Sequence, residues 1–309
     1  MPPRDPDGST DDSTDPSALA RPEFRPDPTL SCEGMEALQR ELATTATFAD
    51  AHGIAPEDVA VARVRDRDRL GPDAFRVVDD GAEEVYAVSG TATGSERLVE
   101  PDPDVPTVVG VDQAFRPDAA EAVSAAVAVR DGVVVDVGGA VTPLSIPYVP
   151  GLLAFREGEP ILAALSALSV VPDLLLCDGS GRIHFREAGI ATHVGVCHDV
   201  PAIGVAKSLL CGKPDESVDE RPAGWRTAIR AGEDVETAAA ETVIGHAFQS
   251  RQYPNSRRVN PLYVSPGHRV ATTTAVDFIE ALCAGYKLPE PIRLADAAAD
   301  AVKTVAAER

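Results

Sequence analysis

From about residue 105 onward, apolar positions fall into short runs and helical patterns. Runs at 108–111, 125–129 and 133–137 predict three neighbouring strands, the last two joined by an Arg-Asp-Gly turn. Further on, the pattern predicts helices over 151–170, 188–196 and 270–284, and strands over 174–177 and 202–206. Antiparallel strands followed by alternating strands and helices indicate an α/β fold, a mixed β-sheet flanked by helices on both faces.

The first third of the chain follows a different pattern. Residues 1–30 are mainly Asp, Pro, Ser and Thr, so we expect a disordered acidic tail. Within 31–104, an extension of unknown role, the spacing of Met35, Leu38 and Leu42 predicts a helix over 34–51 that ends at Gly53. Apolar runs at 75–78 and 85–88 around an Asp-Asp-Gly turn predict a hairpin. A Pro-Asp-Pro-Asp run at 101–104 then marks the boundary to the main domain, residues 105–303.

The composition is strongly acidic. The 309 residues include 49 Asp and Glu against 28 Lys and Arg, for a formal net charge of -21. This charge argues against phosphate binding, but excess acid with few lysines is typical of a cytosolic halophile protein, where salt screens repulsion. Residues 242–276 contain no Asp or Glu but include Arg251, Arg257, Arg258 and Arg269. This segment predicts an anion-facing surface, with a chance gap around two strands as the alternative.

The cysteines and the hydropathy pattern indicate in which cellular compartment the protein is found. Five cysteines are widely spaced and form no C-x-x-C pair, which argues against a disulfide framework or a zinc site and suits a reducing cytoplasm. No apolar run is long enough to span a bilayer, and the polar, proline-rich start of the chain does not resemble a signal peptide. We therefore expect a cytoplasmic monomer with no membrane partner.

Three acidic residues interrupt apolar segments. Asp112 follows the run 107–111 and Asp178 follows 174–177, and ligands of α/β proteins bind beyond the carboxyl ends of strands. Neighbouring carboxylates would repel unless a cation lay between them, and Glu157 adds a third acid on the side of a helix expected to be buried. Oxygen ligands without clustered Cys or His favour Mg²⁺ or Mn²⁺. The alternative is that each Asp caps the turn or helix that follows it.

An aromatic ring stands close to these acids in the sequence. Tyr148 lies between Pro147 and Pro150, and proline fixes the backbone angle φ and keeps the preceding residue extended. The ring should therefore sit on a stiff loop that ends at Gly151. A rigid exposed ring beside an acid fits an enzyme that opens stacked bases, and simple packing of Tyr148 is the alternative.

The remaining candidates are less specific. Lys207, at the end of a predicted strand, can stabilise charge on a phosphate or simply reach water. His268 lies on a predicted turn, 265–269, where backbone amides can also hold phosphate. The glycine-rich loop 178–184 lacks the spacing of a P-loop, and its glycines suit the close approach of a flat ligand bordered by His184 and Gly189.

Five segments, in order along the chain, together resemble the endonuclease V family. They are 147–157 (PYVPGLLAFRE), 178–189 (DGSGRIHFREAG), 203–212 (IGVAKSLLCG), 260–269 (NPLYVSPGHR) and 285–296 (GYKLPEPIRLAD). The resemblance covers roughly residues 106–302, about two thirds of the chain. The chain departs from the family pattern in its acidic N-terminal extension and in Gln113 after the first aspartate.

The resemblance implies a ribonuclease H-like fold and a DNA repair endonuclease. The family uses Mg²⁺, for which Mn²⁺ can substitute, and nicks DNA at the second phosphodiester bond 3′ to deoxyinosine, leaving a 5′-phosphate and tolerating other deaminated bases. By resemblance, Asp112, Glu157 and Asp178 would hold the metal, and Lys207 and His268 would assist catalysis. Tyr148, flanked by Pro147, Pro150 and Gly151, would fill the gap left by the lesion, whose base would enter a pocket near Leu153, Gly179, His184 and Gly189.

Two alternatives remain open at this point. The first is an endoribonuclease specific for inosine in RNA, because the fold does not determine which sugar is preferred. The second is a lesion-binding protein without nuclease activity, in which the acids serve only as caps. Cleavage assays on matched DNA and RNA strands distinguish the first, and substitution of Asp112 or Asp178 distinguishes the second.

Overall fold

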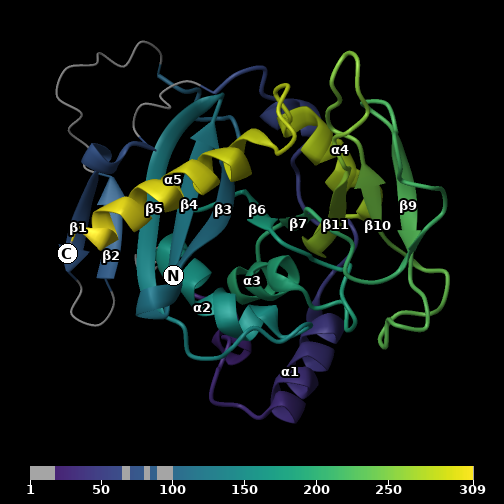
Figure 1. Ribbon diagram of the computed structural model, residues 1–309, viewed down its shortest axis with the longest axis horizontal. Coiled ribbons are helices and arrows are strands. Elements are labelled where there is room, and N and C mark those ends of the chain that lie inside the picture. The colour runs from purple at the N-terminus through teal and green to yellow at the C-terminus, as the bar shows by residue number, and fades with distance from the viewer. Residues whose placement is uncertain (1–17, 65–69, 80–83, 89–99, 309) are drawn as a thin grey trace, which may run out of the picture.

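The computed structural model describes residues 18–64, 70–79, 84–88 and 100–308 (Figure 1). In this part of the chain, one sheet of 11 strands has the order β1-β2-β5-β4-β3-β6-β7-β11-β10-β9-β8. The strands are β1 Phe75–Asp79, β2 Glu84–Val88, β3 Val108–Arg116, β4 Glu121–Arg130, β5 Val133–Pro143, β6 Leu174–Asp178, β7 Ala202–Ala206, β8 Lys213–Pro214, β9 Arg226–Arg230, β10 Val243–Phe248 and β11 Leu262–His268. Only the pairs β3–β6 and β6–β7 are parallel, so the expected mixed sheet is confirmed.

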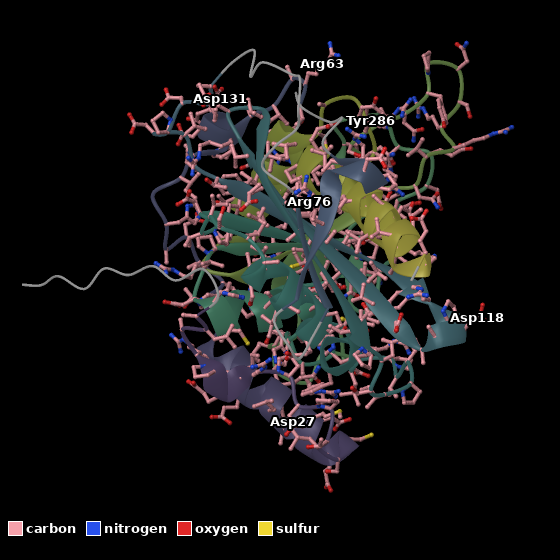
Figure 2. All side chains as sticks on the ribbon, turned by 90° about the vertical axis from the view of Figure 1, so that its left-hand side faces the viewer. Asp27, Arg63, Arg76, Asp118, Asp131 and Tyr286 are labelled. Carbon is pink, nitrogen blue, oxygen red and sulfur yellow. The ribbon has the colours of Figure 1, made fainter. Side chains whose placement is uncertain are left out.

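Helices cover both faces of this sheet. The α-helices are α1 Cys32–Thr45, α2 Leu153–Ser166, α3 Ile190–His198, α4 Thr272–Leu282 and α5 Glu290–Ala307, and short 3₁₀ turns are η1 Pro22–Phe24, η2 Pro56–Val59, η4 Pro72–Ala74 and η5 Pro117–Ala119. Figure 1 shows α5 crossing in front of β5, β4 and β3, and Figure 2, turned by 90°, shows α1 and α5 on opposite sides of the molecule. No described helix is long and apolar enough to cross a membrane.

Alternation along the central strands assigns each residue to a face. Val109, Val111 and Cys177 belong to the core cluster under α2 and α3, whereas Val108 and Leu176 belong to the cluster under α4. Gly110 lies beneath the start of α5, where an added Cβ would be 2.2 Å from the carbonyl carbon of Pro291. The absence of a side chain at this one position lets α5 cross the strand closely.

The segment 18–30 contradicts the expectation of a disordered tail, while residues 1–17 lie outside the described part. Phe24 is only 4% exposed, and its carbonyl accepts a hydrogen bond from His193 Nε2 at 2.6 Å. Arg21 N donates to Cys197 O at 3.0 Å. Phe24, with partly buried Leu19 and Leu30 and the hydrogen bonds to α3, orders this proline-rich stretch.

Other boundaries also differ from expectation. The hairpin of β1 and β2 forms and extends the main sheet beside β5, although its turn, 80–83, lies outside the described residues. Helix α1 ends at Thr45 instead of continuing to 51, and Phe48 instead lies 4.5 Å under the guanidinium of Arg182. The pattern did not predict helix α5, because half of its buried residues are alanines, which give a weak hydropathy signal.

Candidate active site

Strand register places two aspartates side by side. In the parallel pair β3–β6, Val111 pairs with Cys177, so Asp112 and Asp178 are neighbours at the next position. Both point to the face covered by α4 and α5, because they alternate with residues that face α2 and α3. Asp178 ends its strand as predicted. Asp112 does not, because β3 continues to Arg116, and the carboxylate of Asp112 is 8% exposed in the middle of the strand.

The two carboxyl groups share a strongly unfavourable environment for charge. Burial and then the charge of Asp178 raise the pKa of Asp112 to about 8, although Gln113 N donates to Asp112 Oδ1 at 2.8 Å. Lys207 Nζ donates to Asp178 Oδ2 at 2.5 Å. Burial lowers the pKa of Lys207, but this bond and the nearby carboxylates raise it above its usual value overall. The lysine thus partly offsets the charge of the acidic pair.

Glu157 approaches the pair from the second turn of α2. Burial raises its pKa to about 7; the charge of Arg156 lowers it and that of Asp178 raises it further. Its backbone carbonyl accepts a hydrogen bond from Gln113 Nε2 at 2.8 Å, which ties α2 to β3. Within the described residues, no three His, Cys, Asp or Glu side chains are gathered as a ready metal-binding group. Asp112 and Asp178 nevertheless form a desolvated, all-oxygen pair that repels itself, and this fits a hard divalent cation.

A pocket of about 250 Å³ opens beside this pair, between the starts of α2 and α3. Its lining includes six of the predicted substrate-binding positions, Tyr148, Gly151, Leu153, Gly179, His184 and Gly189. Asp178 and Lys207 line the same pocket, so the acidic pair and the predicted base pocket are continuous. Pro147 and Pro150 are exposed beside Tyr148 and are not among the lining residues, and the Tyr148 side chain is 61% exposed.

The wall of this pocket is fixed by a buried polar network around Gly151. The carbonyl of Gly151 accepts hydrogen bonds from Gln39 Nε2 at 2.9 Å and from His184 Nε2 at 3.0 Å. Arg186 Nε donates to Gln39 Oε1 at 2.9 Å, and Arg186 N donates to His184 Nδ1 at 3.2 Å. Gly151 has φ +80°, which only glycine adopts without strain. The extension therefore contributes Gln39, a residue that sequence reasoning missed, to the pocket wall.

His268 is not part of this site, which corrects its predicted catalytic role. It ends β11 opposite Ala202, whereas Asp178 pairs with Val205, so the two lie three residues apart along β7, roughly 10 Å. The ring is 2% exposed; Nε2 donates to Asp199 Oδ1 at 2.9 Å, and Nδ1 accepts from Thr47 N at 3.1 Å. Burial lowers its pKa. His268 therefore joins α3, β11 and the N-terminal extension as a neutral structural residue.

Asp296, on α5, is a second residue that sequence reasoning missed. Its charge helps to raise the pKa of Lys207, which places it near the acidic pair on the same face of the sheet. Asp296 ends the segment 285–296, one of the five that resemble the endonuclease V family, so this resemblance could have identified it. The hydropathy pattern predicts no helix over 290–307, so it does not bring this acid to the sheet.

The sheet and its acidic pair define the chain as a nuclease-like α/β protein of the ribonuclease H-like class. The family model for Endonuclease V matches residues 93–297. The chain therefore belongs to the endonuclease V family, and it is an endonuclease. An Endonuclease V from the halophilic archaeon Halobacterium salinarum is 53% identical over 281 residues, 90% of this chain and 97% of that relative. The predicted family and halophilic character are thus confirmed.

Solved structures agree with this assignment. The Endonuclease V of Streptomyces avermitilis is 30% identical, with a TM-score of 0.63 over 90% of this chain and 95% of that one. The Endonuclease V of Ciona intestinalis, solved with a 24mer DNA containing an inosine followed by a ribo-adenosine, is 23% identical, with a TM-score of 0.58 over 89% of this chain and 97% of that one. The predicted fold is confirmed.

Proposed function

We propose that the protein is a cytoplasmic, Mg²⁺-dependent DNA repair endonuclease that nicks a strand at the second phosphodiester bond 3′ to deoxyinosine and accepts other deaminated bases. The observation that carries the proposal is the Asp112–Asp178 pair with Lys207, at the mouth of a pocket beside an exposed tyrosine. The inosine-containing DNA bound to the Ciona relative supports the choice of substrate. All five cysteines are free, which suits a reducing cytoplasm.

The three acidic side chains and Lys207 have different roles in the proposed reaction. Asp112, Asp178 and Glu157 would hold Mg²⁺, or Mn²⁺ in its place, and the bound ion would activate water and neutralise charge on the phosphate. Lys207 is half exposed, and its raised pKa keeps it protonated at neutral pH, so its ammonium group can contact a phosphate oxygen. Although Lys207 lies beside the pair, burial and Asp178 raise the pKa of Asp112 to about 8, and a bound cation would favour its ionised form.

The neighbouring pocket accounts for recognition of the lesion. Inosine pairs weakly, so extruding it from a duplex costs less than extruding a normal base. The rigid, exposed Tyr148 ring would occupy the gap that the extruded base leaves. Both ring nitrogens of His184 are engaged, with Gly151 O and Arg186 N, so His184 shapes the wall and does not read the base by hydrogen bonding.

A parallel cleavage assay tests this function. Matched DNA and RNA strands, each with one inosine, are incubated with the protein in Mg²⁺ at molar KCl, and the products are sized to locate the cut. Cleavage of DNA at the second bond 3′ to inosine supports the proposal, whereas faster turnover of RNA makes the inosine-specific ribonuclease the better description. No cleavage of either strand, with inosine still bound, would favour the lesion-binding alternative.

Tyr148→Ala supplies an independent test of recognition. Because the ring is exposed, the substitution should leave the thermal unfolding midpoint unchanged while weakening preference for inosine over adenosine. Exposed Val171, at 40%, provides a matched control, since Val171→Ala removes a similarly exposed apolar side chain that is not among those lining the pocket. A Tyr148→Ala protein that loses stability but keeps its preference would show that the ring only packs.

A further inference from the structure

Three arginines in the loop 249–261 have no acidic partner in the part of the chain that the structure describes. Many arginines elsewhere contact carboxylates, as in Arg182–Glu187 at 2.7 Å and Arg293–Glu290 at 2.6 Å. Within the described residues, the loop arginines form no ion pair; they are Arg251, Arg257 and Arg258. Cations left unpaired in a chain of net charge -21 point to an anion from outside the molecule.

The fourth arginine of the acid-free segment lies elsewhere. Arg269 Nη1 is 3.6 Å from Asp199 Oδ2, at the end of β11 opposite to the loop, and Arg269 also donates to Ala51 O at 3.0 Å. The predicted anion-facing surface is therefore confined to the loop 249–261 and does not extend along the whole segment.

The loop is held in shape from within. Gln249, 1% exposed, donates from Nε2 to Arg251 O at 2.8 Å and to Val259 O at 2.9 Å. Gln252 exchanges hydrogen bonds with both backbone groups of Val259, at 3.0 and 3.2 Å. With its backbone fixed in this way, the loop presents its tyrosine and arginine side chains outward in a set arrangement.

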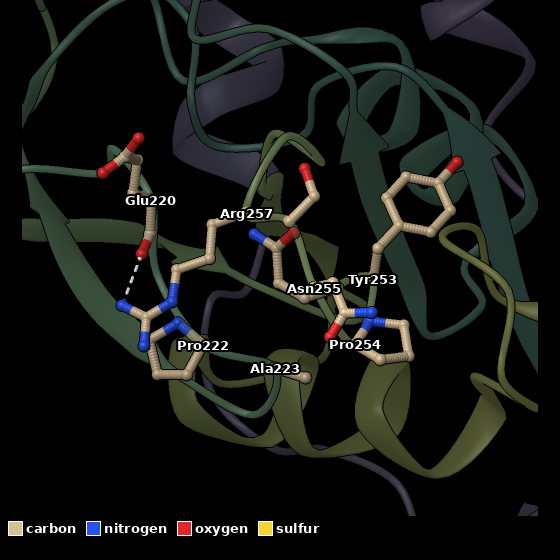
Figure 3. A pocket seen from close by; sticks show the side chains of 9 residues that line it. Glu220, Pro222, Ala223, Tyr253, Pro254, Asn255 and Arg257 are labelled. Carbon is tan, nitrogen blue, oxygen red and sulfur yellow. Dashed lines mark hydrogen bonds between the residues drawn. The ribbon is translucent and has the colours of Figure 1, made fainter.

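A pocket of about 450 Å³ lies in this loop, with Tyr253 and Arg257 among its lining residues (Figure 3). The Tyr253 side chain is 52% exposed, and the guanidinium of Arg251 lies 5.3 Å from its ring centre. Arg257 Nη1 donates to the backbone carbonyl of Glu220 at 3.0 Å, which directs its side chain across the pocket. An exposed ring beside cations is the combination that binds single-stranded nucleic acid, by base stacking and phosphate contact.

Sheet register brings this loop to the edge that carries the acidic pair. The loop joins the end of β10 to the start of β11, and Tyr263 of β11 pairs with Ala206, next to Lys207. Ser250 Oγ donates to Lys287 O at 2.6 Å. Burial and then the charge of Lys207 lower the pKa of Lys287, so the two ammonium groups are near each other. Positively charged side chains therefore extend from Lys207 through Lys287 to the arginines of the loop 249–261.

We propose that the loop 249–261 and Lys287 form a binding surface for the single-stranded segment that lies 3′ to the cut, with a base stacked on Tyr253. This inference rests on the proposed function, which places the lesion in the pocket beside Tyr148 on the α2 and α3 side of the sheet. A strand that leaves this pocket and passes Asp178 and Lys207 reaches the α4 and α5 side, where Lys287 joins these two helices. Its phosphates would meet Arg257 and Arg258.

Two lengths of inosine oligonucleotide test the surface. The short form ends just beyond the expected cut, and the long form carries roughly ten further nucleotides, a span comparable to the site sizes of single-strand-binding folds. Binding is measured by fluorescence anisotropy in a chelator, so that neither cleavage nor metal binding affects the result. Tyr253→Ala should weaken binding of the long form by about 5- to 150-fold, the loss expected for one stacked base, and leave the short form unchanged.

Matched variants and a third substrate sharpen the test. Tyr253→Phe keeps the ring and should recover most of the affinity for the long form, whereas Val171→Ala, also exposed, should change neither form. Arg257→Gln with Arg258→Gln should reduce the salt dependence of binding to the long form only, by about one counterion per lost phosphate contact. Annealing a complement to the 3′ tail should abolish the effect of Tyr253→Ala, because paired bases are not free to stack on the ring.

The outcomes separate this surface from the proposed function. Equal losses on both lengths, no loss on either, or an unchanged Tyr253→Ala effect on the annealed tail would overturn the binding surface. Preference for inosine over adenosine in the short form is measured in parallel and depends only on the pocket beside Tyr148. Loss of that preference in the unmodified protein would refute the proposed function, whereas a length-dependent effect of Tyr253→Ala would still support the surface.

Discussion

At one end of β6 and β7, Asp178 and Lys207 form an ion pair that lines a pocket; at the other end, Asp199 and His268 form a hydrogen bond beneath the N-terminal extension. We call these the catalytic end and the scaffold end. Each combines an aspartate with a basic side chain near a strand terminus, and the residue types alone do not distinguish them. What differs is access, because Lys207 is 51% exposed and His268 is 2% exposed.

This difference shows how burial assigns roles to similar residues. At the catalytic end, burial and the charge of Asp178 raise the pKa of Asp112, and Lys207 remains open to a phosphate. At the scaffold end, the Asp199 carboxylate accepts a hydrogen bond from His268 and forms an ion pair with Arg269 at 3.6 Å, so its charge is compensated within the protein. An uncompensated acidic pair indicates a cation or substrate site, whereas a compensated one indicates structure.

The largest expected effect comes from Asp112→Asn at the catalytic end. Removing one carboxylate from the pair should lower the cleavage rate by roughly 10³-fold, since a metal ion contributes several kcal/mol to stabilising transition-state charge. Without added divalent ion, the same change should raise the free energy of unfolding, because folding no longer has to bury an ionisable carboxyl whose pKa burial and Asp178 raise above the unfolded value. Single-turnover cleavage and urea denaturation measure the two effects.

Asp199→Asn is the matched control, a change of the same kind at the scaffold end. It should leave the cleavage rate within about twofold and lower stability modestly, because a hydrogen bond between a neutral histidine and an amide replaces one to a carboxylate. If both substitutions reduced cleavage equally without unfolding the protein, the division between the two ends would be wrong.

The pattern of strands in the sequence predicts much of the catalytic end. The features that distinguish it from the scaffold end depend on tertiary contacts. The apolar runs before Asp112 and Asp178 predicted neighbouring strands with acids close together, which the register now explains. The sequence could not distinguish His268 from Lys207, because the burial of His268 depends on where α3 and residues 46–51 pack. It also did not reveal helix α5 and its Asp296, since an alanine-rich buried face resembles many polar surfaces in hydropathy.

The next largest effect is the dependence of protein stability on pH, to which the buried side chain of His193 on α3 contributes. This ring is buried, and burial lowers its pKa to about 4, below the usual 6.5, although its bond to Phe24 O opposes the shift. The unfolded chain therefore binds a proton that the folded chain does not, and stability is lost as pH falls from 6.5 towards 4. This group alone should cost roughly 3 kcal/mol of unfolding free energy by pH 4.

Urea denaturation at several pH values measures this linkage. Histidines 184 and 198 also have pKa values lowered to about 4 by burial, so all three contribute to the acid sensitivity. His193→Gln keeps a donor for Phe24 O and removes one titrating group, so the dependence on pH between 4 and 6.5 should become shallower. An unchanged slope would mean that His193 is already charged in the folded protein.

A smaller loss is expected for His268→Ala. The change leaves Thr47 N without its acceptor and removes the donor to Asp199, so the free energy of unfolding should fall by roughly 2 kcal/mol. At a temperature where the variant remains folded, its cleavage rate per molecule should stay within about twofold of the original. Loss of cleavage in a fully folded variant, with an altered pH profile, would return His268 to the catalytic end.

The smallest predicted effect connects the two ends through the extension. Gln39 is fully buried on α1 and donates to Gly151 O, which also accepts from His184 in the pocket wall. Gln39→Ala should lower the unfolding free energy by about 1 kcal/mol, the net value of a typical buried hydrogen bond, and weaken inosine binding by a few-fold, because Gly151 can then shift. Arg40→Ala, one residue along but exposed, should lose its ion pair with Glu236 and leave inosine binding unchanged. If the two variants bound inosine equally well, α1 would only cover the domain and would have no part in shaping the pocket beside Tyr148.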